Sequence, residues 1–250
     1  MNKPEPIIEF INVHKAFNDN KVLNGIDLAI YRGETITIMG GSGIGKSVLL
    51  KLLLGLIRPD KGRILFEGKD IAAMDEGELI GIRKKIGMLF QGSALFDSLT
   101  VYENVAYALR EHLNLKEEEI RERVKEKLGL VGLEDVEDKK PAELSGGMKK
   151  RVGLARAIAI EPEVILYDEP TTGLDPTNSR RINSLIKELQ RVLKVTSIVV
   201  THDIESAYEV SDRIALIYEG RIKKAGAVKD FKSTEDEVVA GFLNGTMESA

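Results

Sequence analysis

A short glycine-rich segment, residues 40–47, constrains the fold more than any other part of the sequence. It reads Gly40-Gly41-Ser42-Gly43-Ile44-Gly45-Lys46-Ser47 and fits the pattern GxxxxGK[ST]. Residues 35–39 before it have the apolar and β-branched character of a buried strand, and residues 46–56 after it are rich in leucine, as in a helix. A strand, a glycine loop and a helix in this order predict an α/β fold with a phosphate-binding loop.

Each part of this loop has a chemical purpose. Glycines allow consecutive backbone N–H groups to turn toward phosphate oxygens, and the following helix adds the positive end of its dipole. Lys46 reaches the β and γ phosphates of a nucleotide, and the Ser47 hydroxyl is a hard oxygen ligand for Mg²⁺. The alternative is a flexible glycine turn with an ordinary surface lysine. The strand before the loop and the helix after it favour nucleotide binding.

Two acidic residues, Asp168 and Glu169, directly follow an apolar strand at residues 164–167. In a doubly wound sheet such a strand delivers its last residues to the carboxyl edge, where a phosphate loop also opens. Asp168 is therefore expected to hold a metal ion, directly or through water. Glu169 is expected to orient or deprotonate an attacking water. Without the phosphate loop, a solvated acidic pair in a surface loop would be the preferred interpretation.

The remaining elements predict one domain with a helical insertion and a small β layer. Short strands that alternate in polarity indicate an antiparallel, half-exposed layer at residues 7–13, 26–30 and 63–66. Residues 100–160 have mostly helical patterns, including a charged amphipathic helix at residues 116–127 in which Ile120, Val124 and Leu128 repeat at four-residue spacing. A later helix carries an apolar stripe that is expected to pack in the core, formed by Ile182, Leu185, Ile186, Leu189, Val192 and Leu193. Continuous apolar strands at residues 197–201 and 214–218 are typical of a parallel sheet that is buried on both faces.

Composition excludes several classes of protein. The 250 residues carry 36 Lys and Arg against 40 Asp and Glu, a net charge of −4, which argues against a general nucleic-acid binder. The sequence has no cysteine, which removes disulfide frameworks, thiolate zinc sites and iron–sulfur clusters and favours a reducing cytoplasm. No apolar run approaches the roughly 18 to 20 residues that span a bilayer, and residues 1–10 lack a signal-peptide core, so we expect no membrane insertion.

A further motif, Leu144-Ser145-Gly146-Gly147-Met148, precedes the acidic strand. Together with the phosphate loop, Gln91, the loop at residues 173–175 and Thr201-His202-Asp203, it makes the chain resemble the nucleotide-binding subunit of ATP-binding cassette (ABC) transporters. The resemblance implies the P-loop NTPase fold: a mainly parallel sheet core, an antiparallel β layer and a helical insertion that carries the signature motif. It extends over residues 1–250 as a single nucleotide-binding domain, with a helical subdomain at about residues 92–160.

The resemblance also implies ATP and Mg²⁺ as cofactors and assigns the site. The catalytic residues it implies are Glu169, His202, Gln91 and Lys46. Those that bind the nucleotide are Phe17, Gly40, Gly41, Ser42, Gly43, Gly45, Lys46, Ser47, Val48, Ser145 and Gly147, and those that hold the metal are Ser47, Gln91 and Asp168. Phe17 stands where the family usually has a tyrosine that stacks on adenine, and its ring keeps the π face. Met148 replaces a common glutamine, but the phosphate contacts are implied for Ser145 and the glycine backbone.

Two partners follow from the resemblance. In the family, Ser145 and Gly147 of one subunit complete the phosphate loop of the other, which implies a homodimer around two ATP molecules. Gln91 links the catalytic site to an integral membrane permease. Residues 95–107 supply apolar side chains near Gln91 (Leu95, Phe96, Leu99, Val101 and Tyr107), which could line a pocket for a short helix of a cytoplasmic permease loop. The protein is then expected in the cytoplasm, on the inner face of the membrane.

Within the family, the sequences of several segments are similar to those of the ATPase of Mla-type transporters, which move phospholipids or related hydrophobic compounds. These segments are residues 91–101, 103–106, 109–111, 144–157 and 167–176. This subgroup implies periplasmic or envelope lipid-binding components as further partners and no nucleic acid. Two alternatives stay open: the ATPase of another ABC importer, such as one for amino acids, and a soluble single-cassette assembly ATPase without a permease.

Three further features receive plain structural interpretations. The basic residues 149–151 are expected at a solvated helix start rather than at a site for lipid head groups. His14 and His112 are expected at the surface. Residues 229–250 are expected to form a docked terminal helix with a frayed end, which is favoured over a partner contact.

Overall fold

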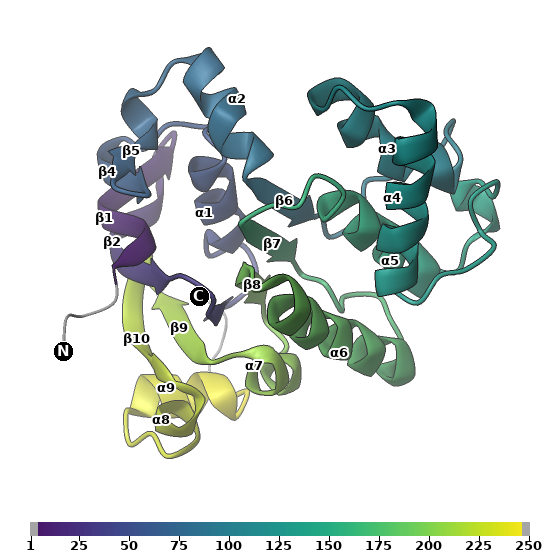
Figure 1. Cartoon of the computed structure of the whole chain (residues 1–250). Helices are drawn as coiled ribbons and strands as arrows, with labels where there is room; N and C mark the ends of the chain where they lie inside the picture. The colour runs from purple at the N-terminus through teal and green to yellow at the C-terminus, as the bar shows by residue number, and fades with distance from the viewer. Residues whose placement is uncertain (1–4, 247–250) are drawn as a thin grey trace. The chain divides into compact units, whose positions relative to one another are not determined.

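The structure, a computed structural model, describes residues 5–246 and forms two compact units (Figure 1). Unit 1 is built from residues 5–83 and 198–246, and unit 2 from residues 84–197. The chain passes from unit 2 to unit 1 within strand β8 (Thr196–Thr201). Each unit is described by itself below.

Unit 1 contains an antiparallel sheet with the strand order β2-β1-β4-β5. The strands are β1 (Pro6–Phe17), β2 (Asn20–Tyr31), β4 (Lys61–Phe66) and β5 (Lys69–Asp70), followed by a short 3₁₀ helix, η1 (Ile71–Ala73). The predicted antiparallel layer is confirmed, although β1 and β2 are longer than expected. Phe17 pairs with Asn20 where β1 turns into β2. This register places Phe17 at the end of the hairpin.

Unit 1 also contains a second group of strands, and the phosphate loop follows one of them, β3. Strand β3 (Thr35–Met39) pairs in parallel with β9 (Arg213–Tyr218), which pairs antiparallel with β10 (Arg221–Ala227). The helices of this group are α1 (Lys46–Leu53), α7 (Ile204–Val210), α8 (Val228–Lys232) and α9 (Glu237–Leu243). Helix α1 ends before the predicted residue 56, because Gly55 adopts a left-handed backbone with φ 63° that cannot continue the helix.

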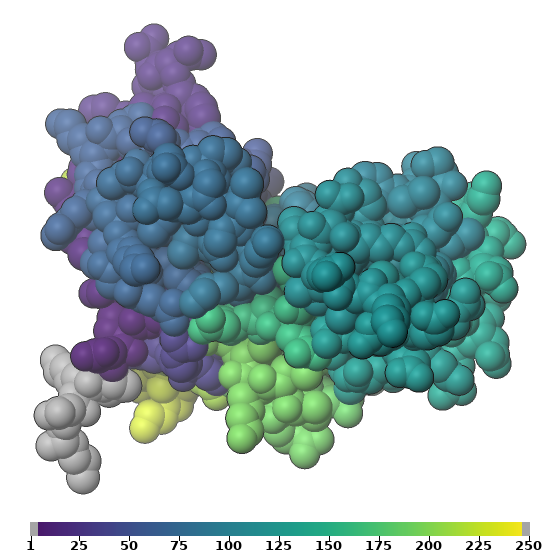
Figure 2. All heavy atoms as spheres, turned by 45° about the horizontal axis from the view of Figure 1, so that its top comes forward, coloured from purple at the N-terminus to yellow at the C-terminus, as the bar shows by residue number. Residues whose placement is uncertain are grey.

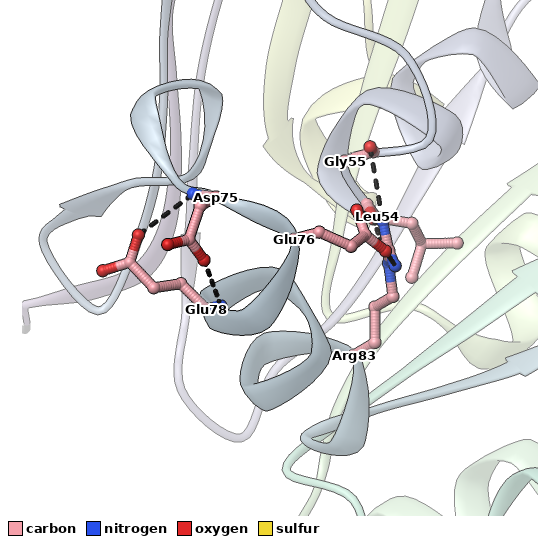
Figure 3. A network of polar contacts seen from close by, with 6 residues as sticks. All are labelled: Leu54, Gly55, Asp75, Glu76, Glu78 and Arg83. Carbon is pink, nitrogen blue, oxygen red and sulfur yellow. Dashed lines mark hydrogen bonds and ion pairs between the residues drawn. The ribbon is translucent and has the colours of Figure 1, made fainter.

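Helix α2 (Glu76–Lys84) supplies a cap for the end of α1, seen in Figure 3. The Arg83 guanidinium donates to the carbonyl oxygens of Leu54 at 2.9 Å and Gly55 at 3.5 Å. Glu76 pairs with the same guanidinium from the first turn of α2. The last carbonyls of a helix have no partner within the helix, so Arg83 satisfies groups that would otherwise need water.

The terminal segment docks on unit 1 as predicted. Phe231 of α8 and Val239 of α9 are buried in one cluster with residues of β3 and β9, and Phe242 and Leu243 pack against it. Figure 1 shows α8 and α9 in yellow beside β9 and β10. The predicted frayed end falls partly on residues 247–250, which lie outside the described residues.

Unit 2 combines a parallel strand pair with helices. Strand β6 (Ile86–Leu89) pairs with β7 (Val164–Asp168). The helices are α3 (Val101–His112), α4 (Glu117–Leu130), α5 (Gly146–Ala157) and α6 (Pro176–Leu193), with a 3₁₀ helix, η2 (Pro141–Glu143). The predicted helical character of residues 100–160 is confirmed. Figure 2 shows atoms of α3 and α4, in teal, at the surface of this unit.

The apolar stripes of two helices of unit 2 were predicted almost completely. Ile120, Val124 and Leu128 of α4 are buried, as their four-residue spacing indicated. Residues 182, 185, 186 and 189 of α6 are buried as well. Val192, which the same stripe includes, is 47% exposed, because it belongs to the last turn of α6. The stripe therefore ends one turn earlier than the sequence pattern suggested.

The prediction of a solvated basic helix start at residues 149–151 is wrong for two of its three residues. Lys149 is half-buried, but Lys150 and Arg151 are buried. Arg151 donates to the carbonyl oxygen of Gly132 at 2.6 Å. The reason is that α5 packs against α3, α4 and β6, so its long side chains reach backbone carbonyls instead of water.

The two histidines that were expected at the surface differ in their exposure. His112 is exposed, as predicted, whereas His14 is half-buried and its Nε2 lies 2.9 Å from Asn12 Oδ1. Across residues 5–246, no helix combines the length and the apolar character needed to cross a bilayer.

Candidate functional site

The phosphate loop of unit 1 has a backbone that depends on glycine. Gly45 precedes α1 with φ 105°, a left-handed value. A Cβ at this position would lie 2.6 Å from Val22 Cγ1 and 2.9 Å from Leu23 Cδ2, so no larger residue fits. The buried Lys46 donates from Nζ to the carbonyl oxygens of Gly40 at 2.8 Å and Gly41 at 2.9 Å. The ammonium group therefore lies along the loop, next to the positive end of α1.

A cavity of about 380 Å³ opens beside this loop, within the range of roughly 300–1,000 Å³ that small-molecule sites occupy. It brings the predicted Gly41, Ser42 and Gly43 together with the start of β2, the β9–β10 turn and α9. The lining residues are Asn20, Lys21, Val22, Gly41, Ser42, Gly43, Ile44, Leu216, Ile217, Tyr218, Glu219, Gly220 and Phe242. A nucleotide held by the phosphate loop can extend into this space.

Two aromatic residues, Phe17 and Phe242, differ in their relation to this cavity. Phe17 is exposed, and Lys15 Nζ lies 5.5 Å from the centroid of its ring. Phe17 does not line the cavity, whereas Phe242 of α9 does. Sequence reasoning missed Phe242, because it belongs to no motif and reaches the loop only through the docking of the terminal helix. The sole signal in the sequence was its place in an apolar pair with Leu243.

His202 lies on a short turn of unit 1 between β8 and α7. The Oγ1 of Thr201 accepts from the backbone N–H of Asp203 at 3.0 Å. The Asp203 carboxylate in turn accepts from the backbone N–H of Ser206 at 3.1 Å and caps α7. The His202 side chain is exposed, and its backbone is fixed on both sides. Ser47 and Val48 are half-buried in the first turn of α1.

In unit 2, the strand register places Gln91 and Glu169 at one edge. Leu89 of β6 pairs with Tyr167 of β7, and the two strands are parallel. Gln91 and Glu169 each follow that pair by two residues, so both loops leave the same carboxyl edge. Asp168, the last residue of β7, is half-buried there. The residue pattern alone predicted this edge for the acidic pair, and the strand register places Gln91 at the same edge.

Glu169 is held in an unusual conformation. It is 8% exposed and has φ 47°, in the left-handed region that non-glycine residues rarely adopt. Its Oε2 accepts from the Thr172 hydroxyl at 3.2 Å. Its carbonyl oxygen accepts from Lys150 Nζ at 3.2 Å, and the same ammonium donates to the carbonyl oxygen of Gln91. Burial lowers the pKa of Lys150, and the negative charges of Asp168 and Glu169 partly oppose that shift.

The signature motif lies at the start of α5. Ser145 is exposed and caps the helix, its Oγ accepting from the Met148 N–H at 3.3 Å. Gly147 is buried, and a Cβ there would lie 2.6 Å from Asn178 Oδ1. Asn178 is fixed by Asp175, which caps α6 and accepts from the Asn178 backbone N–H at 3.0 Å. These bonds lower the pKa of Asp175, so it stays ionised at neutral pH.

The residues predicted to hold Mg²⁺ have suitable donor atoms. Ser47, Gln91 and Asp168 offer a hydroxyl, an amide and a carboxylate oxygen, the hard ligands that Mg²⁺ prefers. Among residues 5–246, no three His, Cys, Asp or Glu side chains gather into a metal cluster. This donor set fits a magnesium ion that is shared with substrate phosphates, since Mg²⁺ in such sites takes only one or two carboxylates from the protein.

Comparison with known proteins adds four findings. The family described as ABC transporter matches residues 23–172. A probable ribonucleotide transport ATP-binding protein, mkl, of Mycobacterium tuberculosis is 42% identical over 238 residues, which cover 95% of this chain and 66% of that protein. The chain thus spans slightly less than two thirds of that relative.

The other two comparisons cover more of the matched proteins. The intermembrane phospholipid transport system ATP-binding protein MlaF of Haemophilus influenzae is 42% identical over 239 residues, which cover 96% of this chain and 90% of that protein. A dimeric post-hydrolysis state of the ATP-binding cassette MJ0796, bound to ADP and Pi, has a TM-score of 0.81 at 35% identity. The match covers 88% of this chain and 98% of that one. The P-loop NTPase fold predicted from the sequence is confirmed by this likeness.

Proposed function

The chain belongs to the ABC transporter family, and on that premise we propose that it is the ATP-hydrolysing subunit of a transporter for phospholipids or related hydrophobic compounds. Its phosphate loop, its acidic edge and its signature motif supply the parts that ATP hydrolysis needs. The transport role rests on a separate surface near Gln91, described below.

In the proposed reaction, water attacks the γ-phosphorus of ATP, and the bond to the β–γ bridging oxygen breaks to give ADP and phosphate. Lys46 and the N–H groups of the loop bind the β and γ phosphates, while His202 contacts the γ-phosphate. Glu169 orients the water and accepts its proton. Ser47, Gln91 and Asp168 would hold Mg²⁺, which neutralises phosphate charge when bound.

We further propose that two copies of the chain act together. Ser145 is exposed at the start of α5, where its hydroxyl and the positive end of the helix can meet a γ-phosphate held by another copy. The likeness to a dimeric cassette bound to ADP and Pi supports this arrangement. A single copy would bind ATP but would lack the signature residues that complete its site.

The observation that carries the transport role is an apolar groove of about 460 Å³ in unit 2. Its aromatic members are exposed, with Phe96 at 45% and Tyr107 at 47%. The lining residues are Ile86, Gly87, Met88, Phe90, Ala94, Phe96, Tyr107, Ala108, Arg156, Ala157 and Ile160. An exposed apolar surface of this kind marks an interaction site more often than a free surface.

Hydrogen bonds within unit 2 hold the segment that forms the groove. Asn104, fully buried in α3, accepts from the Phe96 N–H at 2.8 Å and donates to the Phe96 carbonyl oxygen at 3.1 Å. The rings of Phe96 and Tyr107 lie 5.2 Å apart. Of the five apolar residues expected to line a pocket here, Phe96 and Tyr107 do so, whereas Val101 is buried in the core. Leu95 and Leu99 are half-buried outside the groove.

A short helix from a cytoplasmic loop of a permease is the occupant we propose. Such a helix presents a few apolar side chains on one face, which suits a groove with two exposed aromatic rings. The segment that carries Gln91 also carries Ala94 and Phe96 of the groove. A permease seated there would therefore act on the same loop that reaches the acidic edge. The protein would then lie at the cytoplasmic face of a membrane.

We propose phospholipids or related hydrophobic compounds as the cargo of the transporter. The name of MlaF refers to phospholipid transport, and the name of mkl refers to ribonucleotide transport. The resemblance of residues 91–111 to Mla-type ATPases favours phospholipids. Envelope lipid-binding components would be further partners of such a system. An assembly ATPase without a permease would leave the groove without an occupant.

Phe96→Asp tests the permease contact, because a carboxylate buried in an apolar contact without a partner costs at least several kcal/mol. Val192→Asp is the matched control, since Val192 is 47% exposed in the same unit but lies outside the groove. We expect Phe96→Asp to bind ATP yet to lose co-purification with a multispanning membrane protein from detergent extracts. The control should keep it.

Reconstituted vesicles then identify the cargo. The wild-type complex should move labelled phospholipid in an ATP-dependent manner, and the Phe96→Asp complex should not. Transport of ribonucleotides or amino acids without lipid would overturn the phospholipid proposal. The absence of any integral membrane partner for the wild-type protein would overturn the transport role and leave the ATPase proposal in place.

A further inference from the structure

We propose that Lys150 is a positioning residue that ties the loop of Gln91 to the backbone of Glu169 and thereby sets the place of the catalytic carboxylate. The proposal rests on the function proposed above for Glu169. It concerns a lysine that no motif singles out and that the sequence pattern placed in solvent.

The ammonium group of Lys150 joins two loops that are distant in the sequence. It is 4% exposed and donates to the carbonyl oxygens of Gln91 and of Glu169, the latter at 3.2 Å. The two loops follow the paired ends of β6 and β7. One side chain from α5 therefore closes a bridge across the edge where the two strands end. A change in the position of one carbonyl must move the ammonium or break a bond.

The bridge acts on strained backbone. Glu169 has φ 47°, and in the Gln91 loop Ser93 has φ 64° and Ala94 has φ 48°. Left-handed conformations of non-glycine residues are energetically unfavourable and persist only where the surroundings fix them. Lys150 bonds the carbonyl of the first of these residues. Without that bond, Glu169 can relax toward an ordinary conformation, which would turn its carboxylate away.

Helix α5 holds the other two strained residues through a second cation. Arg156 donates to the carbonyl oxygen of Ala94 at 2.6 Å and to that of Ser93 at 2.8 Å. Arg156 also lines the apolar groove. Helix α5 thus bonds the loop between Gln91 and Phe96 at two places. Lys150 bonds the start of the loop at Gln91, and Arg156 bonds residues 93 and 94. The contacts form a continuous path from the groove to the backbone of Glu169.

The nature of the group matters as much as its place. An ammonium has three donors and a full charge, and its hydrogen bonds to carbonyls are stronger than those of a neutral donor. Asp168 and Glu169 supply negative charge that favours the cation in this buried position. A methionine is one atom shorter, unbranched and without a donor, so it removes the bridge and keeps most of the packing. An arginine keeps both the charge and the donors.

The test compares Lys150→Met with Lys149→Met, a neighbouring half-buried lysine, as the matched control. For Lys150→Met we expect kcat of ATP hydrolysis to fall about 10- to 100-fold, because small misplacement of a catalytic group has effects of this size. The KM for ATP should stay close to wild type, since the phosphate loop is untouched. Lys149→Met should keep both constants, and Lys150→Arg should recover most of the lost kcat.

A double variant separates positioning through Glu169 from other effects. If Lys150 acts by placing the Glu169 carboxylate, adding Lys150→Met to Glu169→Gln should slow turnover no further. Multiplying effects would overturn the proposal, as would wild-type kcat in Lys150→Met. If Glu169→Gln alone turns over normally, Glu169 is not the base, and the proposed function fails. That single variant therefore separates failure of the proposed function from failure of the Lys150 proposal. Should Lys150→Met fail to fold in a thermal melt, Lys150→Gln is judged by the same criteria.

Discussion

The phosphate loop of unit 1 consists of neighbours in the sequence, whereas the acidic edge of unit 2 joins Gln91, Lys150 and Glu169 from three separate segments. In the loop, Gly45 and Lys46 make their contacts with residues of the same turn and of one adjacent strand. At the edge, a buried lysine from α5 bonds the loops that follow β6 and β7. A local motif thus forms the proposed phosphate site, and a tertiary arrangement places the proposed catalytic group.

This difference assigns different tasks to the two regions. In the proposed function the loop holds the phosphates of the nucleotide, so changes in the loop should alter the affinity for nucleotide. Glu169 is proposed to act when water attacks, so changes at the edge should alter turnover. Variants of each region test this division.

The largest effect is expected from damage to the phosphate loop in one copy and to the signature motif in the other. Lys46→Ala and Ser145→Arg should each lower ATPase activity by about 10²-fold or more, since each lesion reaches both sites of a homodimer. A mixture of the two variants places both lesions in one site of a mixed dimer and leaves the other site intact. Partial activity should return. If mixed dimers form and stay inactive, the sites are not shared in this way or must work together.

The signature start should be sensitive to a single methyl group. In Gly147→Ala the new Cβ would lie 2.6 Å from Asn178 Oδ1, so we expect a loss of about 1–3 kcal/mol in the free energy of unfolding from overpacking. Asn178→Ala removes the obstructing amide, and the double variant should recover part of the loss. Urea denaturation measures each value. If the losses in the free energy of unfolding of the two single variants simply add in the double variant, the contact with Asn178 is not what excludes a side chain at residue 147.

The cap on α1 should contribute to stability and not to chemistry. Arg83→Met removes the bonds to the Leu54 and Gly55 carbonyls (Figure 3) and should lower the free energy of unfolding by about 1–2 kcal/mol, the size of hydrogen bonds to a charged group near a surface. Lys84→Met, at the exposed end of α2, is the control. An Arg83→Met protein with normal stability but weak ATP binding would contradict this division.

The smallest effect is expected at the wall of the nucleotide cavity. Phe242→Ala should weaken ATP binding about 2- to 10-fold, in line with the roughly 0.5–1.5 kcal/mol that aromatic contacts contribute, and should leave kcat unchanged. Leu243→Ala is the control, since Leu243 packs on the same cluster but does not line the cavity. Equal losses of affinity in both variants would indicate a general loosening of α9.

The sequence predicted those parts that depend on local patterns. The phosphate loop, the antiparallel layer and the buried stripe of α4 were predicted because glycine spacing, alternation and a four-residue repeat determine them directly. The acidic edge was predicted in part, since an apolar strand that ends in two acids indicates a carboxyl edge. The pairing of β6 with β7, which adds Gln91 to that edge, is a tertiary fact.

The misses share one physical cause. Lys150 and Arg151 carry charges, and a charged run at a helix start is usually solvated. Here the packing of α5 on four other elements brings backbone carbonyls within reach, and these carbonyls replace water. Phe242 was likewise missed because the docking of α9, and no local signal, brings it to the cavity. Which carbonyl or cavity a long side chain reaches depends on contacts distant in the sequence.

The most direct test of the division between binding and hydrolysis compares Lys46→Ala with Glu169→Gln in two assays. ATP affinity is measured by equilibrium binding and turnover by single-turnover hydrolysis at saturating ATP. We expect Glu169→Gln to bind ATP with near wild-type affinity and to lose about 10²-fold or more in turnover. Lys46→Ala should mainly lose affinity. If Glu169→Gln retains near-normal turnover, or if both variants lose affinity alike, the account of two separate tasks is contradicted.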